Sequence, residues 1–342
     1  MSINRLRGPK IKLPYDAVIA VTYRCNARCL MCNIWQTEDA GDLDAALLAK
    51  LPDTLRYVNL SGGEPFLRRD LPELVDAVMA ASPRAQIVIS TNGLVSQGRV
   101  REAAAGFRQR YGDRVGLGVS IDGIGATHDR IRGIDGAFDR ATELVKALRS
   151  DGLTNLRLAF TAVDENVQDF YQVYRLSQEL GVEFTSAVAQ GSSHYFQKDS
   201  TSAVKLEELR GQLDRIAAGE LSSTSPKRWA RAYFERGLYD FARGEGRPLA
   251  CLAADDFFFM SPAGTIYACN VLDLPLGNLR DASFEEIWTS PAAVKARESV
   301  AGCGMGCWMV CTARTAIKRN PLRVAGWVAA GKVKAARGKP VL

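Results

Sequence analysis

The sequence predicts an α/β fold with a mainly parallel sheet from about residue 17 to about residue 190, followed by a small cysteine-containing domain. Two observations lead to this prediction. Short runs rich in β-branched residues alternate with stretches in which apolar residues recur every three or four positions, which is the pattern of repeated βα units. This alternation ends after Gln190, and five of the eight cysteines lie beyond residue 250.

The elements follow in order along the chain. Six segments have the composition of strands: 17–23, 57–61, 86–90, 116–121, 156–163 and 183–189. Between them, segments 42–51, 70–81, 136–150 and 169–180 have the apolar spacing of helices that cover a sheet. Two further helices, 206–219 and 226–244, and a β-hairpin, 257–268, are expected after the last strand. We therefore expect a core with bridging helices over 15–245, a C-terminal cysteine domain over 246–315 and a basic amphipathic tail over 316–342.

The overall charge is modest, since 44 Lys and Arg residues against 38 Asp and Glu give a formal net charge of +6. This value does not indicate a nucleic-acid partner, and none is expected. No apolar run approaches the roughly 18 to 20 residues of a membrane span, and the N-terminal segment lacks the apolar centre of a signal peptide. We therefore expect a cytoplasmic protein, whose cysteines serve metal binding or catalysis rather than disulfides.

Cys25, Cys29 and Cys32 form a CxxxCxxC pattern directly after the first expected strand. Three thiolates can bind three irons of a [4Fe–4S] cluster and leave the fourth iron open, whereas a structural zinc site normally has four protein ligands. On spacing alone, there are two alternatives to an iron–sulfur cluster: a zinc site with a fourth ligand from elsewhere in the chain, or cysteines that are simply buried. A position at the carboxyl end of a strand favours a functional site, because α/β folds place their sites there.

With the apolar Met31 before its last cysteine, this motif resembles the CxxxCxΦC hallmark of the radical S-adenosylmethionine (SAM) superfamily. Segment 61–65, Ser-Gly-Gly-Glu-Pro, resembles the loop that holds the methionyl amino group of SAM in that family, with its glutamate facing the ammonium. Segments 90–93 and 120–123 are similar to those that line the SAM pocket in that family. Arg132 could pair with the SAM carboxylate. The alternative for these polar residues is a structural role as caps at strand-to-helix turns. The resemblance implies a SAM site formed by Met31, Ser61, Gly62, Gly63, Glu64, Pro65, Ser90, Asn92, Ser120, Asp122 and Arg132.

The resemblance also implies a fold and a chemistry. The fold is a partial (β/α)6 barrel of the radical SAM type, with the cluster and SAM at its top. In this family a reduced [4Fe–4S] cluster, whose open iron binds SAM, cleaves it to methionine and a 5′-deoxyadenosyl radical that abstracts hydrogen from the substrate. The protein aims the radical and excludes water. A reductant of the flavodoxin or ferredoxin type is therefore an expected partner.

The C-terminal cysteines begin with the spacing C-x12-G-x4-C from Cys251 to Cys269, followed by Cys303, Cys307 and Cys311. This arrangement resembles the SPASM and twitch extensions of radical SAM enzymes, which hold auxiliary [4Fe–4S] clusters. Five cysteines imply one such cluster, with Cys251, Cys269, Cys311 and either Cys303 or Cys307 as its expected ligands. A structural zinc site is the alternative. The surplus cysteine is a candidate hydrogen donor to a substrate radical.

The expected substrate is a small polar or lipid-linked molecule of the sugar or cyclitol type, which the enzyme would oxidise or epimerise. Only 24 residues precede the first cluster cysteine, so the leader-recognition domain of many peptide-modifying relatives is not expected. The alternatives are a ribosomal-peptide maturase that forms thioether or carbon–carbon crosslinks, and a zinc-stabilised binding or scaffold protein. Candidate catalytic residues are Asp255 and Asp256, as bases, and His194 and Tyr195, in a loop expected to face the substrate; each also fits a structural role.

The tail from Thr312 to Leu342 is rich in Lys and Arg and contains no Asp or Glu. A helix is expected from Asn320 and Pro321 onwards, with apolar residues at helical intervals among the cations. Such a helix could lie on an anionic membrane surface, present cations to a phosphorylated carrier, or simply dock on the protein through its apolar face.

Overall fold

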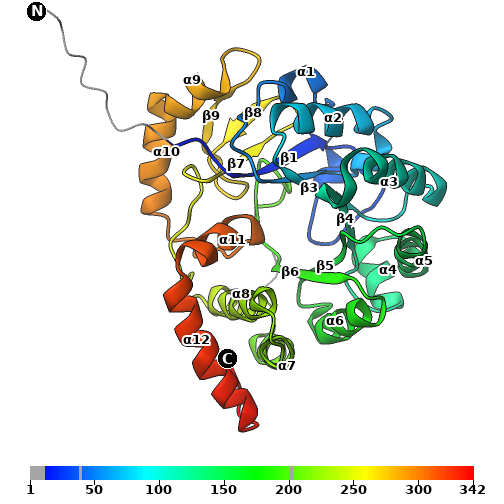
Figure 1. The fold of residues 1–342 in the computed structure, drawn as a ribbon, viewed down its shortest axis with the longest axis vertical. Coiled ribbons are helices and arrows are strands. Elements are labelled where there is room, and N and C mark those ends of the chain that lie inside the picture. The colour runs from blue at the N-terminus through cyan, green and yellow to red at the C-terminus, as the bar shows by residue number, and fades with distance from the viewer. Residues whose placement is uncertain (1–11, 38–40, 200–203) are drawn as a thin grey trace, which may run out of the picture.

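The computed structural model describes residues 12–37, 41–199 and 204–342 of the chain. This part of the chain contains one nine-stranded sheet with the strand order β6-β5-β4-β3-β2-β1-β7-β8-β9 (Figure 1). The first six strands are parallel, so their carboxyl ends lie at one edge of the sheet. They are β1 Asp16–Thr22, β2 Tyr57–Gly62, β3 Gln86–Thr91, β4 Val115–Ser120, β5 Leu156–Ala162 and β6 Glu183–Val188. The predicted parallel α/β core is confirmed.

Helices return the chain from each strand to the next. They are α1 Ala45–Leu48, α2 Leu71–Ala81, α3 Gln97–Tyr111, α4 Ala126–Arg132, α5 Ala137–Ser150 and α6 Phe170–Glu179. The four helices expected between strands occur, although α1 is shorter than predicted and begins after Asp44, whose side chain accepts from the backbone N–H of Ala46 at 2.9 Å. Helix α3 was not expected because it is mostly polar and buries only Val100, Ala104 and Phe107.

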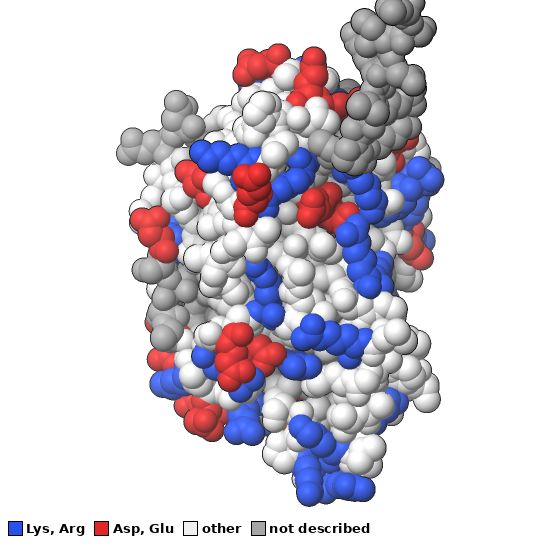
Figure 2. All heavy atoms as spheres, turned by 90° about the vertical axis from the view of Figure 1, so that its left-hand side faces the viewer, with Lys and Arg blue, Asp and Glu red and all other residues white. Residues whose placement is uncertain are grey.

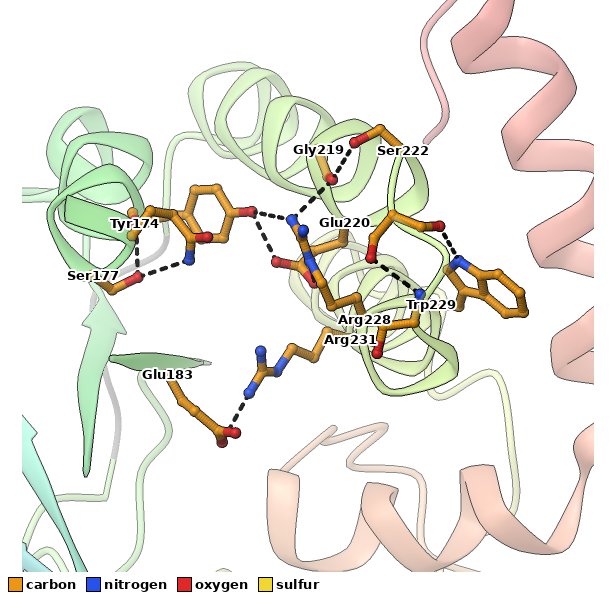
Figure 3. Close-up of polar contacts among 12 residues, drawn as sticks. Tyr174, Ser177, Glu183, Gly219, Glu220, Ser222, Arg228, Trp229 and Arg231 are labelled. Carbon is orange, nitrogen blue, oxygen red and sulfur yellow. Dashed lines mark hydrogen bonds and ion pairs between the residues drawn. The ribbon is translucent and has the colours of Figure 1, made fainter. Parts of the chain in front are cut away.

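Two long helices follow β6 as predicted, α7 Leu206–Leu221 and α8 Pro226–Ala242. They pack against each other. A buried carboxylate joins them to α6 (Figure 3). Glu220 of α7 accepts hydrogen bonds from Tyr174 Oη of α6 at 2.8 Å and from Arg228 Nε of α8 at 3.0 Å. Because both partners satisfy this carboxylate, the three helices are held in one arrangement.

The expected hairpin consists of β7 Phe257–Met260 and β8 Thr265–Tyr267, and β9 Pro275–Asn278 extends it. Strand β7 also pairs in parallel with β1, with Asp16 opposite Phe257 and Ile19 opposite Met260. The C-terminal third of the chain therefore continues the sheet of the core. Local sequence patterns do not reveal this pairing, because they carry no information on which distant strands are neighbours.

The remaining helices are α9 Phe284–Thr289, α10 Pro291–Ala301, α11 Val310–Arg319 and α12 Pro321–Ala336. A capping box at Ser283 starts α9 and directs Phe284 and Trp288 onto Phe258 of β7, with the Phe258 and Phe284 ring centroids 5.0 Å apart. Helix α12, the expected tail helix, packs on α7 and α8. None of the described helices combines the length and apolar character that a membrane crossing requires.

One contact between α8 and the segment before α11 gives a testable prediction. A Cβ added at Gly237 would lie 2.3 Å from Nε1 of Trp308, a buried ring whose Nε1 donates to the Phe234 carbonyl oxygen at 3.0 Å. Because this ring is fixed, Gly237→Ala should lower the free energy of unfolding by roughly 1–3 kcal/mol. Thermal unfolding measures the change. Gly106→Ala in α3, where an added Cβ meets no atom within 4 Å, is the control and should be neutral or stabilising. Equal melting temperatures for both variants would contradict the prediction.

Candidate functional site

A cavity of about 270 Å³ lies at the carboxyl edge of the six parallel strands. Cys25, Cys29 and Cys32 lie in the loop that follows β1, half-buried, and all three line this cavity. The loop is held against α4, since the backbone N–H of Leu30 donates to the carbonyl oxygen of Ile131 at 3.0 Å. The sequence pattern and the structure therefore bring the same three thiols to one surface.

Gly62 and Gly63, at the end of β2, pack directly on the cysteine loop. A Cβ at Gly62 would lie 2.1 Å from the carbonyl oxygen of Thr22, and one at Gly63 would lie 2.0 Å from that of Arg24. Gly62 also has a φ of +129°, which side chains disfavour. The two glycines are needed because β2 approaches the cysteine loop this closely, and both line the cavity.

Glu64 does not reach the cavity. Its carboxylate is fully buried and accepts hydrogen bonds from Phe66 N at 3.0 Å, Thr91 Oγ1 at 2.9 Å and Asn92 N at 2.7 Å. Burial raises the pKa of this carboxyl to about 7, against the lowering effect of the three donors. The structure thus contradicts the expectation that the Glu64 carboxylate and Pro65 contact SAM, because both are buried behind the cavity wall. Glu64 instead ties the end of β2 to the end of β3.

Arg132 and Asp122 form a buried ion pair beside the cysteines. Arg132 lines the cavity, and its Nη1 donates to Cys29 Sγ at 3.4 Å. Burial opposes the charge of Arg132, but Asp122 and the Cys29 thiol raise the pKa of the guanidinium above its usual value. Asp122, 1% exposed, accepts from Thr161 N at 2.6 Å and does not line the cavity. Arg132 is therefore a fixed cation at the cavity surface. Asp122, which was predicted to contact SAM, instead serves as the counter-ion of Arg132.

The other predicted SAM-site residues do line the cavity: Met31, Ser61, Gly62, Gly63, Ser90, Asn92, Ser120 and Arg132. Several residues that line the cavity were not predicted, and Gln190 is the most informative of them. Gln190 follows β6, is 8% exposed, and its Oε1 has no hydrogen-bond partner within the described part of the chain. A buried, unpaired acceptor beside a cavity fits a donor on a bound ligand. In the sequence, the only sign that Gln190 belongs to the site is its position just after the sixth strand.

The two candidates on the loop after β6 have different surroundings. Tyr195 lines the cavity, and its hydroxyl lies 2.7 Å from Ser61 Oγ; burial raises its pKa to about 12. His194 does not line the cavity. Its Nε2 lies 3.1 Å from the carbonyl oxygen of Cys269, and its ring stacks on Tyr267 at 4.6 Å. Tyr195 therefore faces a ligand as a neutral hydroxyl, whereas His194 connects this loop to the second group of cysteines.

Asp255 and Asp256 lie outside the cavity, and the structure contradicts their proposed role as bases. Both precede β7, whose amino end pairs with the amino end of β1, whereas the cavity lies at the carboxyl edge. Asp256 is 1% exposed and ion-paired with Arg319. Asp255 is 58% exposed and lies 3.7 Å from Arg297. These carboxylates serve the attachment of α10 and α11 to the sheet.

The second cysteine group surrounds a smaller cavity of about 20 Å³. Its lining includes Cys251, Cys269, Cys303 and Cys307, but not Cys311. Cys311 is buried in α11, and burial together with the negative charge of Asp16 raises the pKa of its thiol. The lining of this cavity favours a different ligand set from the expected one, because Cys303 and Cys307 both line it, which leaves Cys311 as the surplus cysteine.

The thiols present fit the two expected iron–sulfur clusters. Three line a cavity with a cation and an amide beside them, since Asn92 Nδ2 lies 3.9 Å from Cys25 Sγ and Arg132 reaches Cys29. Four surround the smaller cavity, where the backbone N–H groups of Val271 and Leu272 donate to Cys269 Sγ at 3.4 and 3.1 Å. Donors to sulfur stabilise the thiolate form that binds iron. A set of three thiols leaves one iron open, whereas a set of four closes a cluster.

Comparison with known proteins agrees with this arrangement. The model of the radical SAM superfamily matches residues 19–177, and that of the SPASM domain, an iron–sulfur cluster-binding domain, matches residues 251–311. The resemblance seen in the sequence is confirmed, and with it a SAM-binding [4Fe–4S] cluster and an auxiliary iron–sulfur centre. The alternative of a zinc-stabilised scaffold is not supported by these matches.

Curated relatives were also found. An AdoMet-dependent heme synthase from Oleidesulfovibrio alaskensis is 27% identical over 296 residues, which cover 78% of this chain and 72% of the relative. An Fe-coproporphyrin III synthase from Methanosarcina barkeri is 29% identical over 309 residues, covering 79% and 72%. Among solved structures, native anSMEcpe with bound AdoMet and the Cp18Cys peptide has a TM-score of 0.59 and 14% identity, covering 93% of this chain and 99% of that one. This likeness concerns the fold alone.

Iron content tests the assignment of the auxiliary ligands. After anaerobic reconstitution, we expect Cys303→Ser and Cys307→Ser to hold about four irons fewer than wild type, or a damaged second cluster, since each removes one of four thiols. Cys311→Ser should keep the wild-type iron content, because Cys311 lies outside the smaller cavity. Iron and sulfide are measured per chain. Loss of iron in Cys311→Ser together with retention in Cys307→Ser would contradict the assignment.

The hydrogen bonds by which Glu64 ties the end of β2 to the end of β3 give a second prediction. In Glu64→Gln an amide nitrogen replaces one acceptor oxygen and meets N–H or O–H donors, so a buried donor loses its partner. We expect a stability loss of about 1–3 kcal/mol and weaker SAM binding. Melting temperature and the Kd for SAM are measured. The exposed Glu73→Gln in α2 is the control, with the same change of charge and no expected effect. An unchanged melting temperature and an unchanged Kd for SAM in Glu64→Gln would show that Glu64 does not hold the ends of β2 and β3 together.

Proposed function

We propose that this protein, a radical SAM enzyme with a C-terminal SPASM domain, abstracts hydrogen from a small, uncharged polar substrate of the sugar or cyclitol type and oxidises it. Free or lipid-linked forms of such a substrate share this chemistry. The observation that carries the proposal is the composition of the cavity wall. Radical SAM enzymes need a reductant, for which we propose a flavodoxin or ferredoxin.

Among the described residues that line the cavity, Arg132 is the one with a charged side chain, and Asp122 already neutralises it. The other polar side chains are hydroxyls, amides and the cluster thiols. An uncharged substrate with hydroxyl groups can be bound by such groups without an unpaired buried charge. A substrate with several carboxylates would require more cations than this wall supplies.

The chain's own residues have separable tasks in this reaction. Bound SAM and the reduced cluster together supply the radical that takes a hydrogen atom from the substrate. Arg132 keeps its Nη2 paired with Asp122, and its Nη1, which lies beside Cys29, can donate a hydrogen bond to the SAM carboxylate. Tyr195 and Ser61 present a hydrogen-bonded pair of hydroxyls, and Gln190 presents an unpaired acceptor. These groups can orient a polyol so that one C–H bond meets the radical.

Two features favour oxidation over epimerisation. Met309 lies in the wall of both cavities, so the larger cavity adjoins the cavity that the second cysteine group surrounds. A cluster held there by Cys251, Cys269, Cys303 and Cys307 would supply an acceptor for the electron that a substrate radical loses along with a proton. Epimerisation would instead require a hydrogen donor, and the surplus Cys311 lines neither cavity.

A tetrapyrrole is a second candidate substrate. The relatives that align with more than three quarters of this chain include a heme synthase and a coproporphyrin synthase, at 27% and 29% identity. Such identity leaves room for a different substrate. The single, already paired cation in the cavity wall argues against a ligand with several carboxylates.

Formation of 5′-deoxyadenosine tests the proposal. Reconstituted enzyme receives SAM and dithionite with either cyclitols and sugars deuterated at each carbon, or iron coproporphyrin III. We expect a polyol to raise 5′-deoxyadenosine above the substrate-free rate and deuterium to enter it. The product should be about three mass units lighter than the deuterated substrate, because oxidation to a ketone removes one deuterium from carbon and one hydrogen from the hydroxyl group. If iron coproporphyrin III raises the formation of 5′-deoxyadenosine and no polyol does, a tetrapyrrole replaces the polyol as the proposed substrate. An isomer about one mass unit lighter, in which hydrogen has replaced one deuterium, would indicate epimerisation.

Gln190→Leu tests the unpaired acceptor. Removing it should weaken the binding of the ligand that donates to it by about tenfold, because one hydrogen bond in a buried site is lost. Kd for SAM and KM for the substrate identify that ligand. Gln168→Leu, exposed and outside the cavity, is the control. If neither constant changes in Gln190→Leu, this side chain does not contact a ligand.

A further inference from the structure

Helix α12 is apolar on two opposite sides. Its inner side, with Val324, Val328 and Gly331, is buried against α7 and α8. On its outer side Leu322 is 88% exposed and Val333 is 50% exposed. The residues between them on this side are small and exposed: Ala325, Gly326 and Ala329.

These outer residues form one stripe, because positions three and four apart share a helix face. We refer to residues 322, 325, 326, 329 and 333 as the outer stripe. A surface helix normally places polar side chains on the side that faces water, whereas this stripe consists only of apolar residues. An exposed apolar stripe of this kind indicates a contact with something other than water.

Cations flank the outer stripe. Arg323, Lys334 and Arg337 are exposed along one of its sides. Lys332 lies on the other side, where its ammonium is 4.2 Å from the centre of the Trp229 ring. The chain contains no Asp or Glu from residue 312 to its end. In Figure 2 the lower tip of the molecule, where α12 ends in Figure 1, carries Lys and Arg side chains beside uncharged atoms.

We propose that the outer stripe of α12 and its flanking cations bind the surface of an anionic lipid bilayer. A row of apolar residues between cations is the arrangement by which helices lie in the membrane interface: the apolar row enters the acyl boundary and the cations meet acidic headgroups. A second copy of this chain is a poor occupant, because it would bring like charges together. The proposal goes beyond the reaction proposed above and does not rest on it.

Vesicle binding tests this surface. The full reconstituted chain is sedimented with vesicles of phosphatidylcholine alone, and with vesicles in which phosphatidylglycerol replaces part of it. We expect binding to the anionic vesicles, declining as salt is raised, and little binding to the neutral ones. Equal binding to both, or to neither, would overturn the proposal.

Matched variants locate the contact. Replacing Arg323, Lys334 and Arg337 with Gln should weaken binding roughly a hundredfold. The control replaces three exposed cations elsewhere, Arg69, Arg84 and Lys146, and should bind like wild type.

The apolar stripe is tested separately. Leu322→Ser combined with Val333→Ser should weaken binding about tenfold. The control is Val294→Ser in α10, a valine that is 46% exposed away from α12 and should have no effect. Melting temperatures verify that every variant is folded.

Other occupants of the stripe would give different results. If the α12 variants bind vesicles like wild type but lose reduction by flavodoxin or ferredoxin, the stripe serves an acidic protein and the lipid proposal is wrong. If they instead lose self-association in analytical ultracentrifugation, the occupant is a second copy. Cleavage of SAM with dithionite is measured in parallel. Vesicle binding needs no catalysis, so a failure of either proposal is seen independently of the other.

Discussion

The site depends on the contact between the end of β2 and the loop that follows β1. Gly62 and Gly63 lie so close to the carbonyl oxygens of Thr22 and Arg24 that no Cβ fits between them. This contact fixes the loop whose cysteines face the cavity, and the buried Glu64 then secures the same turn to the end of β3. Three strand ends thus become one rigid wall, as a site that must direct a reactive radical requires.

Strand β1 has a second role, because β7 pairs with its other edge. The hairpin of β7 and β8 carries Cys251 just before it and Cys269 just after it, so the auxiliary thiols are positioned by the same strand that carries the first cysteine loop. Met309, next to Cys307, completes the arrangement as a wall shared by the two cavities. The two cysteine groups therefore belong to one continuous structure.

Features encoded by short segments could be predicted from the sequence, and features that depend on distant pairing could not. The alternating strands and helices were correctly predicted, because they reflect a local pattern. The CxxxCxxC loop and polar strand ends such as Ser90 and Ser120 line the cavity, and they too were recognised from local motifs. Asp255 and Asp256 were assigned wrongly because the β1–β7 register, which puts them at the amino edge, joins segments far apart in the chain. Cys311 was expected as a ligand together with only one of Cys303 and Cys307, because spacing does not reveal that Cys303 and Cys307 both line the smaller cavity and Cys311 does not. Gln190 belongs to no motif, and only its unpaired oxygen beside a cavity marks it.

The pairing of β1 with β7 also sets an order of events during synthesis. Strand β1 is complete by residue 22, but its neighbour on one side begins only at residue 257. Until the ribosome has released that segment, one edge of the central strand has unpaired backbone groups, which is the condition in which nascent sheets associate wrongly. Contacts between such distant segments also slow folding, because a long loop must close before they form. The first cysteine loop can therefore be shaped by β2 early, whereas the auxiliary centre can be assembled only when the chain is nearly finished.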